Sequence, residues 1–116
     1  MQSLSELEQL AVRALQAAGA SLEQAGITAR ALVAAEAQGL ASHGLSRIPM
    51  YVGHLQAGRV NGRATPAIVA ERASAVLVDA GDGFAFPACQ LAVYEAISRA
   101  QVTGIPIGAV KNSHHF

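Results

Sequence analysis

Two short polar segments combine histidine with serine, arginine or asparagine, side chains that can bind a substrate or exchange a proton with it. The first runs from Ser42 through His43 to Arg47, and a continuous helix would place His43 and Arg47 four residues apart on one face. An arginine guanidinium matches the two oxygens of a carboxylate, and a histidine exchanges a proton near neutral pH. The segment therefore predicts a carboxylate receptor beside a proton-transfer group. The structural alternative is a serine that caps a helix, with a solvated histidine and arginine.

The second segment is Asn112-Ser113-His114-His115. Neighbouring side chains on extended backbone point to opposite sides, so we expect only one of the two histidines to face a pocket. A histidine at this place suits general acid or base catalysis coupled to carbonyl chemistry. Two alternatives stay open. The segment is a polar strand end without catalytic function, or it joins His43 and His54 in a metal site, for which the typical spacing of zinc ligands is missing.

A third segment, Gly81-Asp82-Gly83, is rich in glycine but lacks the pattern of a phosphate-binding loop. Phe86 stands where the dinucleotide pattern G-x-G-x-x-G needs its third glycine, and the pattern G-x-x-x-x-G-K-[ST] is absent. We therefore expect a turn that leads into a helix, and no Rossmann cofactor site. His54, Cys89 and Tyr94 are interpreted as structural residues, with Tyr94 at a core position.

Apolar residues at spacings of three and four predict two helices before these segments. Each predicted helix follows a serine with Glu or Gln three residues later, which is a capping-box pattern, and each ends at a glycine. The first helix follows Ser3 and ends at Gly19, and the second follows Ser21 and ends at Gly39. A third helix is expected from Ser42 to about Gln56, with a late start or a kink because Pro49 lies inside it.

The second half of the chain predicts a small sheet with one long helix. Two β-type runs at 67–70 and 75–78 are expected to form a hairpin around the turn between them. A long helix over 84–102 follows, in which Pro87 is tolerated only in the first turn, and the run 105–110 predicts a third strand. The expected fold class is α/β (α+β), with N-terminal helices followed by a small sheet that packs against a long helix.

Composition excludes several classes of protein. The 116 residues include 52% hydrophobic and 14% charged residues, which excludes a disordered chain. Eight basic and eight acidic residues cancel, so no basic surface for nucleic acid is expected. One cysteine excludes a disulfide framework, and no run of about 18 apolar residues could span a membrane. The first ten residues lack a secretory-signal pattern, so we expect a cytoplasmic protein whose weakly charged surface is covered by a partner or by further chain.

Three stretches of the sequence resemble, in this order, the motifs of the malate/L-lactate dehydrogenase family, which includes ureidoglycolate, sulfolactate and cyclic-imino-acid dehydrogenases and reductases. They are residues 34–47 (AAEAQGLASHGLSR), residues 78–88 (VDAGDGFAFPA, less closely) and residues 111–116 (KNSHHF). Gln38 stands where the family commonly has arginine, and Ala41 where a polar residue is frequent. The resemblance implies a non-Rossmann dehydrogenase fold that uses NAD or NADP to oxidise a 2-hydroxy acid to a 2-oxo acid, or to reduce an imine.

The same resemblance implies roles for individual residues. Ser42 and Arg47 bind the substrate, with Arg47 on its carboxylate, while His115 and His43 are catalytic. His115 is then the base that takes the hydroxyl proton as hydride leaves for the nicotinamide. His114 aligns where the family often has asparagine, so it is the second candidate for the base, after His115. No residue is assigned to a metal or to the cofactor.

Family chains are much longer than 116 residues, and they form homodimers with sites near the subunit contact. The resemblance therefore implies that residues 1–116 are the N-terminal part of a dehydrogenase, without its cofactor-binding domain and inactive alone. The implied partners are a small 2-hydroxy or 2-oxo acid and a second subunit. The alternative is a non-catalytic binding or interaction module of the same fold.

Overall fold

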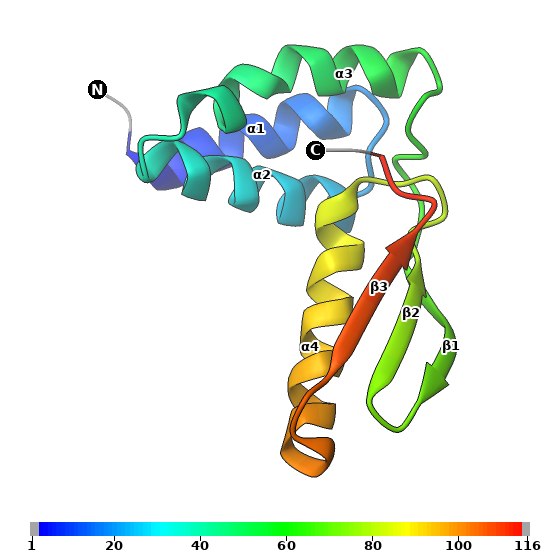
Figure 1. Ribbon diagram of the computed structural model, residues 1–116. Coiled ribbons are helices and arrows are strands. Elements are labelled where there is room, and N and C mark those ends of the chain that lie inside the picture. Colours follow the sequence, from blue (N-terminus) through cyan, green and yellow to red (C-terminus); the bar gives the residue numbers. More distant parts are fainter. Residues whose placement is uncertain (1–2, 115–116) are drawn as a thin grey trace.

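The computed structural model describes residues 3–114, which form a helical layer and an α/β layer (Figure 1). Helices α1, α2 and α3 make up the helical layer, and α4 extends away from it together with a three-stranded sheet. In chain order the elements are α1 (Leu4–Ala17), α2 (Leu22–Ala37), the short 3₁₀ turns η1 (Ala41–His43) and η2 (Leu45–Arg47), α3 (Ile48–Gln56), β1 (Ala67–Arg72), β2 (Ala75–Asp79), α4 (Ala85–Thr103) and β3 (Ile107–Lys111). The expected fold class is confirmed.

The two predicted N-terminal caps are present. The hydroxyl oxygens of Ser3 and Ser21 each accept a hydrogen bond of 3.1 Å from the backbone N–H three residues later. Gly19 (φ 118°) and Gly39 (φ 84°) follow the two helices in the left-handed region, which glycine adopts without steric cost. The predicted starts and ends of α1 and α2 are therefore confirmed.

The third helix differs from its prediction. It begins at Ile48 and has Pro49 in its first turn, where the missing N–H of proline costs nothing. Residues 41–47 form η1 and η2 instead, and Gly44 separates the two turns. The late start is thus confirmed, whereas the expectation that Ser42 and Arg47 belong to one continuous helix is wrong.

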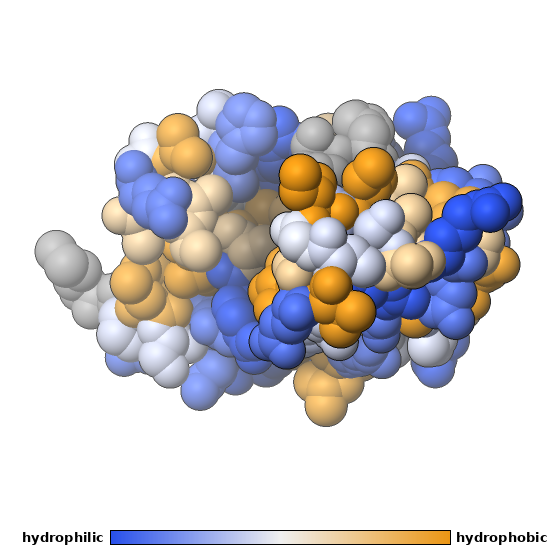
Figure 2. Space-filling model, turned by 60° about the horizontal axis from the view of Figure 1, so that its bottom comes forward, coloured by the Kyte–Doolittle hydropathy of each residue, from blue (hydrophilic) through white to orange (hydrophobic). Residues whose placement is uncertain are grey.

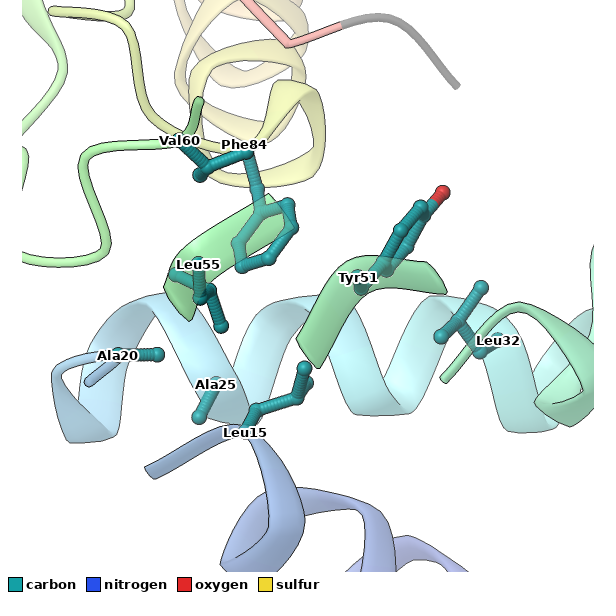
Figure 3. Close-up of a cluster of buried hydrophobic side chains, with 8 residues drawn as sticks. All are labelled: Leu15, Ala20, Ala25, Leu32, Tyr51, Leu55, Val60 and Phe84. Carbon is teal, nitrogen blue, oxygen red and sulfur yellow. The ribbon is translucent and has the colours of Figure 1, made fainter. Parts of the chain in front are cut away.

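A hydrophobic core joins the helical layer to the start of α4 (Figure 3). Its large members are Leu15 of α1, Leu32 of α2, Tyr51 and Leu55 of α3, and Phe84, which immediately precedes α4. The rings of Tyr51 and Phe84 lie 5.2 Å apart between centroids. Burial of an apolar side chain of this size contributes about 2 kcal/mol. This packing fixes α3 against α1, α2 and the start of α4. The polar segment that precedes α3 is held with it.

The sheet has the strand order β1-β2-β3. β1 and β2 form the predicted antiparallel hairpin, and β3 pairs with β2 in parallel after the α4 crossover. Val76 and Val78 of β2 pack against Ala88 and Ala92, so α4 covers one face of the sheet (Figure 1). The predicted hairpin, long helix and third strand are confirmed. Tyr94 is 62% exposed, so its predicted core position is wrong, because small alanines form the packed face of α4.

Gln24 connects the two layers from inside α2. Its side chain is fully buried, with Nε2 donating to the Ala64 carbonyl at 2.8 Å and Oε1 accepting from the Phe84 N–H at 3.0 Å. The side chain therefore does not return to its own helix start to complete a capping box. Because both of its polar ends are paired, the amide is buried without an unsatisfied group.

Candidate functional site

Glu36 of α2 contacts the first polar segment at Gly44 and Leu45, where η1 passes into η2. Glu36 Oε1 accepts a hydrogen bond of 3.0 Å from the Leu45 N–H. A side chain at Gly44 would place its Cβ 2.6 Å from that same oxygen and 3.2 Å from the Glu36 Cα. Glycine is therefore required at position 44 by the close approach of α2. Glu36, the acidic residue three positions before Gly39 in the motif, thus has a supporting role that local sequence patterns do not indicate.

The side chains of this segment bond to one another. Ser42 Oγ lies 3.0 Å from His43 Nδ1, and Arg47 Nε donates to the Ser42 carbonyl at 3.0 Å. Ser46 Oγ donates to the Ala41 carbonyl at 2.7 Å. The prediction that His43 and Arg47 share one helical face is wrong, because they lie in two separate turns. Both residues nevertheless contact Ser42. The structure therefore brings together the three residues expected in this segment, by a different local geometry.

The guanidinium of Arg47 is held in a way that suits a carboxylate ligand. Its Nε is used by the Ser42 carbonyl, and no carboxylate among residues 3–114 forms an ion pair with it. The two terminal nitrogens are the pair that binds two carboxylate oxygens side by side. Arg47 is half-buried, while Ser42 and His43 are exposed, so a small acid can reach all three side chains.

The second polar segment begins at the end of β3 and is fixed to the turn before α4. The Asn112 carbonyl accepts from the Asp82 N–H at 2.7 Å, and the His114 N–H donates to the Gly83 carbonyl at 2.9 Å. Asn112 Nδ2 also donates to Asp79 Oδ1 at 3.2 Å. The Gly81 N–H and the Asn112 amide both donate to this carboxylate, which lowers the pKa of Asp79 below its usual value of 3.8.

His54 of α3 has a partner that its sequence position did not indicate. Its Nδ1 lies 2.8 Å from Nε2 of His114, a residue 60 positions later in the chain. The His114 ring also meets Tyr51 and Phe84 edge to face, at centroid distances of 5.4 and 5.6 Å. This contact within the fold is compatible with the interpretation of His54 as a structural residue. Only the long-range packing of α3 on the end of β3 creates the pair, and no local pattern could have predicted it.

The expected catalytic residue His115 lies outside the described residues. Within residues 3–114, no group of three or more histidine, cysteine, aspartate or glutamate side chains is arranged to hold a metal ion. Burial raises the pKa of the Cys89 thiol, which favours its interpretation as a structural residue. No helix in the described range is long and apolar enough to cross a bilayer.

The glycine-rich turn does not fit the pyrophosphate of a dinucleotide. A helix N-terminus binds phosphate through free backbone N–H groups. Here the four consecutive N–H groups of residues 81–84 all donate within the protein, at 2.7 to 3.0 Å. Their acceptors are, in order, Asp79 Oδ1, the Asn112 carbonyl, the Ala80 carbonyl and Gln24 Oε1. The turn is therefore a structural junction, as expected.

Apolar surface is exposed away from the two polar segments. Val102, Ile105 and Ile107 are 87%, 81% and 63% exposed where α4 passes into β3. This end of the molecule comes forward in Figure 2, which shows apolar side chains at the surface. A shallow cavity of about 460 Å³ on the sheet face opposite α4 is lined by residues that include Leu77 and Ile107. None of the expected site residues lines it.

Comparison with known families gives one match over nearly the whole chain. A family profile described as malate/L-lactate dehydrogenase matches residues 2–116. A (2R)-3-sulfolactate dehydrogenase (NADP(+)) of Chromohalobacter salexigens is 47% identical over all of this chain and 34% of its own length. A Δ1-pyrroline-2-carboxylate/Δ1-piperideine-2-carboxylate reductase of Pseudomonas putida is 39% identical over 97% of this chain and 33% of its own length.

Solved structures that superpose on this chain belong to the same kinds of enzyme as the sequence relatives. Δ1-piperideine-2-carboxylate reductase of Pseudomonas syringae superposes with a TM-score of 0.94 at 38% identity, covering 100% of this chain and 36% of that protein. Sulfolactate dehydrogenase of Methanocaldococcus jannaschii superposes with a TM-score of 0.91 at 30% identity, covering 98% and 33%. The chain thus spans about a third of the length of the relatives that it matches.

Proposed function

Because this chain belongs to the malate/L-lactate dehydrogenase family, we propose that the whole protein transfers a hydride between NAD or NADP and a small 2-hydroxy acid of the malate, lactate or sulfolactate type. Residues 1–116 contribute the part of the site that binds the acid. Most of the cofactor-binding residues are proposed to lie beyond residue 116, and the glycine-rich turn is not proposed as a phosphate site because its four N–H groups, 81–84, donate within the protein. The proposed location is cytoplasmic and the proposed assembly a homodimer.

The arrangement of Arg47, Ser42 and His43 is the observation that carries this proposal. The Ser42 carbonyl fixes the Nε edge of the guanidinium and so orients its two terminal nitrogens for a carboxylate. A carboxylate held in this way fixes the adjacent carbon, which is the carbon that carries the hydroxyl group in a 2-hydroxy acid. The substrate is therefore bound through its carboxylate, and its hydroxyl-bearing carbon is oriented for hydride transfer.

Proton transfer is the second requirement of the reaction. Oxidation of the alcohol removes the hydroxyl proton to a base as the hydride leaves the carbon for the nicotinamide, which accepts it. We assign this base to His115, with His43 as the second catalytic residue. The contact of His43 Nδ1 with Ser42 Oγ fixes the imidazole, so its Nε2 is the nitrogen available to the substrate.

A cyclic imino acid is the second candidate substrate. The Pseudomonas putida relative is a reductase of two such acids by its name. These molecules also have a carboxylate next to the carbon that gains the hydride, so Arg47 would bind both classes in the same way. Arg47 binds the carboxylate that both classes of substrate share, so it does not select between them.

The test is a substrate screen on the purified whole protein with NAD and with NADP. Reduced nicotinamide is followed by its absorbance with malate, lactate, sulfolactate and ureidoglycolate, and its consumption is followed with cyclic imino acids. Turnover of at least one acid supports the proposal. Absence of turnover with every acid and both cofactors contradicts it and favours the alternative of a non-catalytic binding module.

A further inference from the structure

We propose that His54 is a positioning residue: its hydrogen bond to His114 holds residues 112–114, which immediately precede the proposed base His115 in the chain, against α3, the helix that begins after Arg47. This inference rests on the proposed function, since it concerns the general base of that reaction. His54 itself need not touch the substrate. It acts through the segment to which it is bonded.

The first supporting observation is the place of His54 in the fold. α3 begins directly after Arg47, and His54 lies about two turns further along the same helix. The Nδ1 to Nε2 distance of 2.8 Å is that of a direct hydrogen bond between imidazoles. The pair therefore connects the two polar segments of the candidate site, which are about 70 residues apart in the chain.

The second observation is the packing of the His114 ring. It lies with its edge against Tyr51 and Phe84, both of which are almost completely buried. His114 is half-buried, and pairing of its Nε2 with His54 stabilises a polar ring against such an apolar surface. Loss of this partner would favour movement of the ring out of its aromatic surroundings.

The third observation is that the backbone is held from the opposite side. The His114 N–H donates to the Gly83 carbonyl, and the Asn112 carbonyl accepts from the Asp82 N–H. The turn before α4 thus fixes the backbone of the segment while His54 fixes its side chain. With both contacts present, the backbone and the side chain of His114 are each held by a different part of the fold.

Three variants of His54 separate positioning from a general structural role. His54→Asn keeps a hydrogen-bonding atom bonded to Cγ, as Nδ1 is, whereas His54→Gln moves that atom one bond further and His54→Leu removes it. In the whole protein, we expect His54→Leu and His54→Gln to lower kcat by ~10 to 100-fold, since a displacement of about 1 Å has an effect of this size. The KM for the acid should change by less than about threefold, because Arg47 binds in the ground state and in the transition state alike.

Rescue is the decisive readout. His54→Asn should recover most of the kcat that His54→Leu loses, at the same KM. Gln56→Leu is the matched control, since Gln56 is exposed near the end of the same helix. Thermal unfolding of every variant shows whether a lower kcat reflects unfolded protein. If His54→Leu does not fold, the comparison of His54→Asn with His54→Gln decides.

The outcomes distinguish this inference from the function on which it rests. An active wild-type protein whose kcat is unchanged in His54→Leu or His54→Gln contradicts the positioning role alone. The same holds if His54→Asn is as impaired as His54→Leu, or if all variants raise KM and leave kcat unchanged. Absence of turnover in the wild-type protein contradicts the proposed function itself, and the positioning role with it.

Discussion

Replacement of Gly44 by alanine tests whether α2 supports the first polar segment. The new Cβ would lie 2.6 Å from Glu36 Oε1 and 3.1 Å from Glu36 Cβ. The carboxylate can swing away, but it then gives up its hydrogen bond to the Leu45 N–H. The backbone of the segment must also move, because the Glu36 Cα lies 3.2 Å from the new methyl group.

The expected loss of stability has two parts. A hydrogen bond to a charged acceptor contributes ~1.5 kcal/mol when it is partly exposed, as this one is. Displacement of packed atoms by an added methyl group costs ~1 kcal/mol at the lower end of the usual range. Gly44→Ala should therefore lower the free energy of unfolding by about 2 to 3 kcal/mol, measured by urea denaturation.

Gly53→Ala is the matched control, because a Cβ at Gly53 in α3 meets nothing within 4 Å. Alanine is favoured over glycine inside a helix, so this variant should be unchanged or up to ~1 kcal/mol more stable. In a Glu36→Ala background, Gly44→Ala should lose about half of its effect, because the hydrogen bond and the 2.6 Å contact with Oε1 are then absent while the contacts with Cα and Cβ of residue 36 remain. Equal effects of Gly44→Ala with and without Glu36 would show that contact with Glu36 does not cause the loss of stability.

Replacements of Gln24, Asp79 and His115 test a buried amide, a hydrogen-bonded carboxylate and the proposed base. Gln24→Leu leaves the Ala64 carbonyl and the Phe84 N–H without partners inside the protein and should lower the free energy of unfolding by about 2 to 4 kcal/mol in denaturant titrations. The pKa of Asp79 is lowered by folding, so its stabilising contribution is present above its unfolded pKa and disappears as the pH falls through the folded value, below 3.8. Asp79→Asn should therefore flatten the acid side of a plot of stability against pH and leave its slope between pH 6 and 8 unchanged, whereas an unaltered acid limb would contradict this assignment. His115→Ala in the whole protein should lower kcat by ~10² to 10⁴-fold with little effect on KM, and steady-state kinetics that show no loss of kcat would exclude His115 as the base.

The elements of this fold could be predicted where the signal was local. Serine caps three residues before Glu6 and Gln24, and glycines after each helix, gave the limits of α1 and α2 within two residues. These signals are contacts between near neighbours in the chain, which the sequence records directly. The predicted core position of Tyr94 is wrong because a helical pattern does not show which side of a helix the sheet covers.

The candidate site was predictable in its residue types but not in its geometry. The break at Gly44 depends on Glu36, which is on the preceding helix, so no pattern within residues 41–47 could reveal it. The partner of His54 lies 60 residues away for the same reason. Contacts of this kind depend on how α3 packs against its neighbours, and that packing is a property of the whole fold.

The proposed contact of Arg47 with the substrate carboxylate can be measured through the KM for the acid. Arg47→Gln removes a bidentate ion pair with the substrate carboxylate, a loss of about 3 kcal/mol that corresponds to a ~100-fold higher KM. Arg47→Lys should lie between wild type and Arg47→Gln, because lysine keeps the charge without the planar fork. Arg13→Gln, at an exposed position of α1, is the matched control and should not change KM. We expect a ~100-fold rise in KM for Arg47→Gln alone. A KM equal to that of the wild-type protein would show that Arg47 does not bind the substrate carboxylate.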